Sequence, residues 1–324
     1  MTIMSLLGCA GNSDNSPSAP EEFNPFYRDH MRSLVGRMAA YARQVTADFI
    51  VIPQNGLQLL TLNGEPGGRL AGEYVAAIDG IGREELFYGF DRDNEATPAS
   101  VTDQWMPFLD RAEGAGIQVL VVDYCDSPAR VDDSYLRNST KGYISYAGPR
   151  ELDRISAYPQ IPHRMNADDV TSLARAQNLL YLLNPGNYDS RANFVAALAA
   201  TNYDLVLIDA FFDRDDPLTA RDVALLGVKA DGGRRLVLAY FSIGEAEDYR
   251  YYWRDVWDDD PPAWLAAENK DWRGNFKVRY WDPEWQAVLF GADDAYLDRI
   301  LAAGFDGVYL DIIDAFEYFE QNGD

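Results

Sequence analysis

Short apolar runs, separated by segments with helical spacing, recur eight times along this chain. They cover residues 49–52, 75–86, 117–123, 142–147, 179–184, 204–209, 236–242 and 307–311, of which the second is the least regular. Most are apolar throughout rather than alternating, which is typical of strands covered by helices on both faces. Eight such strands in 324 residues predict an α/β fold of the (β/α)8 TIM-type barrel class, with an open doubly wound sheet as the alternative.

Two of these units are near copies of each other. Asp204 opens one run and Asp209 closes it, and Asp306 and Asp311 stand in the same relation in the last run. Repetition of one strand–helix unit is natural in a barrel.

Helices are predicted between the runs. Apolar residues from Met31 to Val45 fall on one face of a helix that begins near Phe26. Ser190 is placed to be the N-cap of another helix.

Polar side chains stand at the end of nearly every apolar run. They are Gln54, Asn55, Asp123, Tyr146, Asn184, Asp209, Ser242 and Asp311. In a barrel these positions converge on the C-terminal face, where catalytic groups lie. An aspartate or asparagine after a strand can also be only the N-cap of the next helix. The repetition along the chain nevertheless predicts a pocket.

The amino-acid composition excludes several kinds of site and partner for that pocket. The chain has only two histidines (His30, His163) and two cysteines (Cys9, Cys125), which excludes a disulfide scaffold and leaves no credible soft-metal site. The net charge of −24 argues against a nucleic-acid partner, because no basic stripe is present to neutralise phosphates. No GxxxxGK[ST] or GxGxxG motif supports a nucleotide site.

Carboxylates, amides, hydroxyls and aromatic rings remain, and they suit hydrolysis of a glycosidic bond by a pair of carboxyl groups. We therefore expect no cofactor and no metal; Asp91, Asp93 and Asn94 resemble the start of a calcium loop but lack its glycine. Aromatic residues between Tyr249 and Trp257 are candidates to stack on sugar rings, or to serve only in packing.

The acidic charge has two interpretations. One is solubility or adaptation to salt, and the other is electrostatic steering of a cationic substrate into an acidic cleft.

The first residues look like a bacterial lipoprotein leader. Residues 6–9 (LLGC) have the form of a lipobox, in which Cys9 is lipidated, and a Ser/Asn/Pro-rich tether follows. We expect residues 1–22 to lie outside the fold and residues 23–324 to form a single domain. The predicted location is extracytoplasmic, either secreted or lipid-anchored, with membrane contact only through Cys9.

Several longer motifs carry a family resemblance. Residues 240–250 (YFSIGEAEDYR), 307–318 (GVYLDIIDAFEY) and 52–56 (IPQNG) resemble the endo-α-1,4-polygalactosaminidase family, glycoside hydrolase family 114, and its bacterial glycosidase-like relatives. Shorter matches are residues 83–88 (REELFY), 121–124 (VVDY) and 144–147 (ISYA). The resemblance implies a TIM-type barrel that cleaves an α-1,4-linked galactosamine polysaccharide internally. This polymer is cationic where it is deacetylated.

The order of these motifs differs from that of the family. In the family the segments like those at 204–250 and 307–318 come first, whereas here they come last, which indicates a circular permutation. A closed barrel tolerates this because its ends meet. We therefore expect Phe26 and Gln321 to lie near each other on the catalytic face, with residues 155–177 joining the former termini.

The resemblance also implies roles for individual residues. Asp311 falls on the catalytic aspartate, the expected nucleophile, and Glu84 on the acid/base, with Glu85 one register step away. Asp209 and Asp123 would be pocket carboxylates, and hydrogen bonds to the sugar would come from Tyr240, Ser242, Gln54 and Asn55, with Tyr146 and Asn184 as further binding residues. Glu245 and Glu247 would either bind substrate or cap the following helix. A separation of about 5 Å between the two catalytic carboxyl groups would imply retention, and about 6.5–9.5 Å inversion.

Two other functions stay open on the same barrel. One is a catalytically silent carbohydrate-binding lipoprotein, and the other is a hydrolase of a different glycan, because a fold does not determine a substrate.

Overall fold

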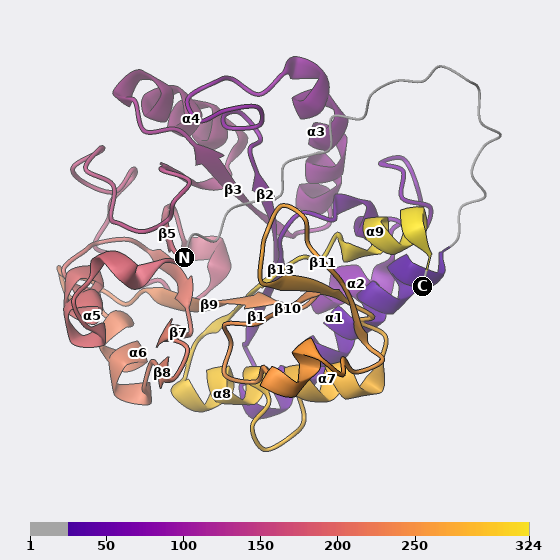
Figure 1. Ribbon diagram of the computed structural model, residues 1–324. Helices are drawn as coiled ribbons and strands as arrows, with labels where there is room; N and C mark the ends of the chain where they lie inside the picture. The colour runs from indigo at the N-terminus through magenta and orange to yellow at the C-terminus, as the bar shows by residue number, and fades with distance from the viewer. Residues whose placement is uncertain (1–24, 324) are drawn as a thin grey trace.

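A computed structural model describes residues 25–323 of the chain, and Cys9 lies outside this part. Eight parallel strands form the centre of the fold, and helices lie around them (Figure 1). The parallel strands are β1 (Ile50–Pro53), β2 (Gly80–Glu84), β3 (Gln118–Tyr124), β4 (Ile144–Gly148), β5 (Leu179–Leu182), β6 (Leu205–Asp209), β9 (Leu236–Ser242) and β13 (Gly307–Asp311). The helices are α1 (Phe26–Val45), α2 (Gly72–Ala77), α3 (Ala99–Gly114), α4 (Pro128–Lys141), α5 (Arg191–Ala199), α6 (Ala220–Leu226), α7 (Pro283–Leu289), α8 (Tyr296–Ala303) and α9 (Ala315–Asn322).

The parallel strands follow one another in a single row. Hydrogen-bonded ladders join them in the orders β5-β6-β9-β13-β1 and β2-β3-β4, and a parallel bridge between Gln54 and Gly82 connects the two groups. The outer strands β4 and β5 have Cα atoms within 8 Å of each other, but no ladder joins them among the described residues. The fold is therefore α/β with a parallel central sheet. This arrangement is compatible with the predicted barrel, although residues 25–323 do not form a closed ladder.

The predicted runs correspond to these eight strands, with one correction. The run at 75–86 contains the end of α2 up to Ala77 before β2 begins at Gly80. Within β2, Gly82 is required by a close approach, because a Cβ there would lie 2.0 Å from the phenolic oxygen of Tyr309 in β13. Gly80 and Gly82 also make the strand hard to recognise in the sequence.

Small antiparallel elements lie at the carboxyl ends of the parallel strands. They are β7 (Phe211–Asp213) with β8 (Asp216–Pro217), and β10 (Glu245–Glu247) with β12 (Asn275–Val278) and β11 (Leu265–Glu268). These two small sheets extend the structure beyond the carboxyl ends of the central parallel strands.

The predicted helical faces are largely observed. In α1 the residues Met31, Leu34 and Met38 are buried, whereas Val45 is 65% exposed at the last position of the helix, where the buried face has ended. Ser190 caps α5 by accepting a hydrogen bond from the backbone N–H of Asn193. No helix within residues 25–323 combines the length and the apolar character needed to cross a membrane.

The first and last described helices pack together (Figure 1). Arg28 of α1 pairs with Glu320 of α9 at 2.8 Å, and the rings of Tyr27 and Phe319 are 5.7 Å apart. Because α9 follows Asp311 directly, this contact lies on the side of the sheet where the strands end. Phe26 and Gln321, which were predicted to lie near each other, thus belong to two helices that pack together.

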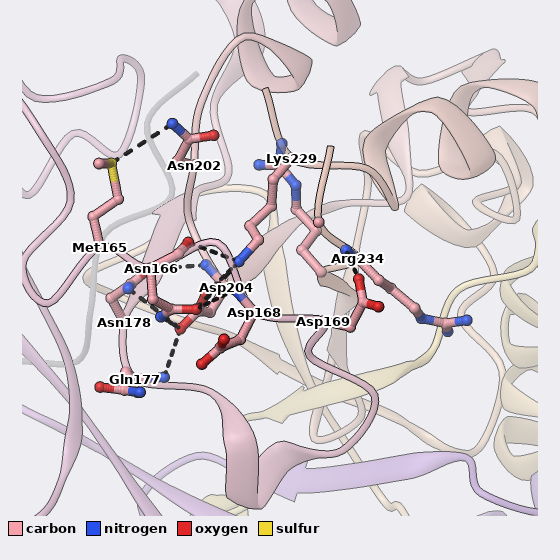
Figure 2. A network of polar contacts seen from close by, with 12 residues as sticks. Met165, Asn166, Asp168, Asp169, Gln177, Asn178, Asn202, Asp204, Lys229 and Arg234 are labelled. Carbon is pink, nitrogen blue, oxygen red and sulfur yellow. Dashed lines mark hydrogen bonds and ion pairs between the residues drawn. The ribbon is translucent and has the colours of Figure 1, made fainter. Parts of the chain in front are cut away.

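Two aspartates that immediately precede strands make hydrogen bonds at the amino ends of the parallel strands. Asp204, before β6, accepts a hydrogen bond from the backbone N–H of Gln177, and Asp306, before β13, accepts one from Val237. Asp204 also pairs with Lys229 at 3.1 Å, and both side chains are fully buried. Figure 2 shows this pair surrounded by Asn166 and Asn178, so the segment at 155–177 is tied to β6 by buried polar contacts.

Candidate active site

A cavity of about 860 Å³ opens at the carboxyl ends of the parallel strands. Of the predicted site residues, seven line it: Asn55, Glu84, Asn184, Asp209, Tyr240, Glu245 and Asp311. They come from strand ends that are far apart in the sequence. The predicted convergence of polar strand ends on one pocket is therefore observed for this group.

Asp311, the last residue of β13, lines the cavity and lies between two donors. The Tyr240 hydroxyl donates to its Oδ2 at 2.6 Å, and the backbone N–H of Ile312 donates to its Oδ1 at 2.8 Å. Burial raises the pKa of Asp311 well above its ordinary value, and the charge of Glu84 raises it further, while the Tyr240 hydrogen bond lowers it. The carboxyl groups of Asp311 and Glu84 are thus electrostatically coupled.

Glu84 ends β2, and its side chain is held by two polar neighbours. The Tyr124 hydroxyl donates to Oε1, and the Asn55 side chain donates to Oε2 at 3.5 Å. Glu84 is 4% exposed and lines the cavity.

Glu85 points elsewhere. Its carboxylate pairs with Arg150, and it is not among the residues that line the cavity. Burial, followed by the charge of Glu84, raises the pKa of Glu85 to about 7 even though Arg150 opposes this shift. Of the two candidate acid/bases, Glu84 has the better position.

Three strand ends next to the cavity have left-handed backbone. Asn55, Glu85 and Ile312 have φ values of 60°, 58° and 56°. Such a conformation costs about 1–3 kcal/mol per non-glycine residue and is least tolerated by a β-branched residue such as Ile312. Gly244 gives the Ile312 backbone room, because a Cβ at position 244 would lie 2.1 Å from the Ile312 carbonyl oxygen. Strain is therefore concentrated directly beside the two coupled carboxyl groups.

A buried arginine neutralises the carboxylate of Asp209. Arg250 Nη1 lies 2.7 Å from Asp209 Oδ2, and Arg250 Nε lies 2.5 Å from Glu247 Oε2. The Tyr249 hydroxyl donates to the other oxygen of Glu247 at 2.7 Å. Burial, the largest cause, raises the pKa of Asp209 against the opposing effect of Arg250. Asp209 and Arg250 line the cavity, whereas Glu247 lies behind them.

Five predicted residues are buried away from the cavity and are bonded internally. Asp123 accepts from the backbone N–H of Phe87 at 2.9 Å and from Ser134 Oγ at 2.6 Å. Gln54 accepts from Tyr181, Ser242 donates to the Glu245 carbonyl, Tyr146 shares a hydrogen bond with Ser156, and Glu247 holds Arg250. These contacts support the residues that do line the cavity.

The sequence did not point to several residues of the cavity wall. Trp272 and Arg273 come from the turn between β11 and β12, and Arg214 and Phe212 come from the β7–β8 hairpin. Among the aromatic residues predicted at the rim, Tyr249 lines the cavity, whereas Trp253 and Trp257 pack on each other with ring centroids 5.3 Å apart. A tryptophan inside a polar turn, KDWRGN at 270–275, is the only signal that could have identified Trp272.

The acidic turn at 91–94 is occupied by protein contacts. Asp93 pairs with Arg150 at 2.7 Å, and the Asn94 side chain accepts from the backbone N–H groups of Asp126 and Ser127. Within residues 25–323, no group of three or more His, Cys, Asp or Glu residues is arranged to hold a metal ion.

Comparison with known proteins gives a match to the second half of the chain. Residues 181–324 match the sequence model of glycoside-hydrolase family GH114. This segment runs from β5 to the end and includes Asp209, Tyr240, Glu245 and Asp311, whereas Glu84 and Asn55 lie outside it. The match supports a relationship to this family.

Three uncharacterized proteins are similar to parts of the chain. One from Methanocaldococcus jannaschii is 39% identical over 158 residues, which is 49% of this chain and 43% of that protein. One from Deinococcus radiodurans is 46% identical over 121 residues, 37% of this chain and 36% of that protein. One from Thermotoga maritima is 49% identical over 86 residues, 26% of this chain and 25% of that protein. The aligned parts therefore span less than half of each relative.

Proposed function

We propose that this protein is an endo-acting glycoside hydrolase of α-1,4-linked galactosamine-type polysaccharide, with Asp311 and Glu84 as its catalytic pair. The observation that carries the proposal is the placement of these two coupled carboxyl groups at one cavity. The match of residues 181–324 to a glycoside-hydrolase family supports the reaction class.

In the proposed reaction Asp311 attacks the anomeric carbon while Glu84 donates a proton to the leaving oxygen. Tyr240 and the Ile312 N–H stabilise the ionised form of Asp311 by donating to it. Glu84 then removes a proton from the water that releases the product. Asn55 and Asn184 offer amide groups to sugar hydroxyls from the cavity wall.

The raised pKa of Asp311 favours a second assignment, in which Asp311 is the acid and Glu84 the nucleophile or base. A substrate with an activated aryl leaving group separates the two assignments, because such a group leaves without protonation. The variant that lacks the acid recovers activity on this substrate, and the variant that lacks the nucleophile does not.

The charge of the cavity supports a cationic amino sugar. Seven acidic side chains line the cavity, against three arginines, of which Arg250 is already paired. An acidic cleft attracts a polycation, and salt weakens this attraction.

The test is reducing-end release from partially deacetylated α-1,4-galactosamine polymer by the wild type, Asp311→Asn and Glu84→Gln. Release by the wild type and loss in both variants is the expected result. Binding without release would instead favour a silent carbohydrate-binding protein, and neither binding nor release would indicate another glycan.

We propose further that residues 23–324 form one domain in a circularly permuted order. The contact between Arg28 and Glu320 and a family match that begins at residue 181 support this arrangement. A chain rearranged to begin at residue 178, with residue 323 linked to residue 25, should fold and retain activity.

Lipidation of Cys9 and an extracytoplasmic location are also part of the proposal. They rest on the lipobox-like sequence at residues 6–9. Membrane partitioning of the protein and its loss in Cys9→Ser test them.

A further inference from the structure

Trp272 differs from the other tryptophans of this chain. Each of the other six has an aromatic ring or an arginine against its indole. Within residues 25–323 Trp272 has no such partner, although it is partly buried and lines the cavity. Its indole N–H is buried and finds no acceptor among the described residues. Trp272 therefore lines the cavity with a partly exposed indole that has no aromatic or cationic partner among the described residues, and this points to a ligand that packs against the ring.

The turn that carries Trp272 has a fixed geometry. The backbone N–H of Trp272 donates to the Asn269 carbonyl at 3.2 Å, and the Trp272 carbonyl accepts from the N–H of Asn275 at 3.1 Å. The Gly274 N–H donates to Glu268 at 2.9 Å. The ring is therefore presented by an ordered turn.

Glu245 accepts hydrogen bonds from residues on both sides of this turn. The Asn269 side chain donates to Glu245 Oε1 at 2.8 Å, and the Asn275 side chain donates to Oε2 at 3.2 Å. Glu245 is fully buried, and Lys277, 2.5 Å from Oε1, balances its charge. Because the support exists before a ligand arrives, little conformational entropy is lost when the ring is used.

We infer that Trp272 is the platform on which one sugar ring of the substrate stacks, and that Glu245 is a positioning residue that acts through Asn269 and Asn275. The occupant is a pyranose ring, because it has an apolar C–H face that matches an indole and a rim of hydroxyls that matches the surrounding carboxylates and amides. The inference rests on the proposed function and adds to it a subsite of stated chemistry.

Binding to the Asp311→Asn protein tests the platform without interference from turnover. The probe is a short α-1,4-galactosamine oligosaccharide, and the readouts are calorimetric Kd and the ligand-induced change in tryptophan emission. Adding Trp272→Ala should weaken binding by about tenfold, whereas Trp272→Phe should weaken it by about threefold. Trp272→Phe should also abolish most of the emission change. The matched control is Trp281→Phe, because Trp281 packs between Tyr27 and Phe319, away from the cavity lining, and should leave both readouts unchanged.

A double-mutant cycle tests the positioning role. Glu245→Gln should weaken binding by about threefold in a protein that has Trp272, and should have no additional effect after Trp272→Ala. Additive losses would show that Glu245 acts independently of the indole, and would overturn its positioning role.

Failure of the platform inference and failure of the proposed function would give different experimental results. Wild-type affinity and an unchanged emission response in Trp272→Ala would overturn the platform and leave the proposed hydrolase intact. If the Asp311→Asn protein binds no oligosaccharide and the wild type releases no reducing ends, both the proposed substrate and the platform are overturned.

Discussion

Tyr240 donates a hydrogen bond of 2.6 Å to Asp311 from the neighbouring parallel strand. The register pairs Asp311 with Ser242, so Tyr240 stands two residues before that pair and projects from the same side of the sheet. A hydroxyl in this position stabilises the ionised carboxylate against the effects of burial and of the charge on Glu84.

Replacing Tyr240 by Phe should therefore raise the pKa of Asp311 still further. If ionised Asp311 is the nucleophile, the acid limb of kcat/KM will move to higher pH, and activity at neutral pH will fall by roughly 10- to 100-fold. The measurement is a pH–rate profile of both proteins. An acid limb that stays in place would show that Asp311 ionisation does not control the reaction.

Asp311→Asn should abolish turnover and stabilise the fold. In the unfolded chain Asp311 titrates near its ordinary pKa of about 3.9, whereas burial raises its pKa in the folded protein. A raised pKa favours folding at acid pH, and this contribution is lost as the pH rises from the unfolded to the folded value. The gain in Tm on substitution should thus be larger at pH 8 than at pH 4. A uniform shift in Tm would contradict this explanation.

Glu84→Gln and Glu85→Gln should behave differently although the two residues are adjacent. Glu84 lines the cavity, so its substitution should reduce kcat on the polymer by roughly 100-fold or more. Glu85 pairs with Arg150, so its substitution should affect stability more than kcat. Steady-state kinetics combined with thermal unfolding compares them, and a larger kinetic defect in Glu85→Gln would reverse the assignment.

Lys229→Met should destabilise the protein by about 3–5 kcal/mol, because it leaves Asp204 buried without its cation. The effect should appear in denaturant unfolding, with little change in KM because this pair lies at the opposite end of β6 from Asp209. Asp204→Asn combined with Lys229→Met should recover part of the loss. If the double variant shows the sum of the two single losses, the residues are not energetically coupled.

The sequence predicted the parallel α/β fold because apolar runs and helical spacing are local properties. It also predicted the polar strand ends, and Asn55, Asn184, Asp209 and Asp311 do line one cavity. It could not distinguish these from Asp123 or Tyr146, which lie near the ends of β3 and β4 but are buried and bond to Ser134 and Ser156. The direction of a side chain depends on the local backbone and on what packs beside it.

The two similar strand units also show that the sequence pattern did not predict where each side chain lies. The pattern at 204–209 and 306–311 indicated one repeated design, but it did not show that Asp204 and Asp306 fix strand starts while Asp209 and Asp311 line a cavity.

Residue type and spacing by themselves thus determined the order of strands and helices and the excess of carboxylates, and the family resemblance of the motifs implied the candidate pair Asp311 and Glu84. Tertiary structure decided which glutamate faces the cavity, which arginine neutralises Asp209, and that a turn more than 180 residues from Glu84 contributes Trp272 to the same wall. The physical reason is that charge coupling and binding depend on distances in space. These distances are set when strands far apart in the chain are packed side by side.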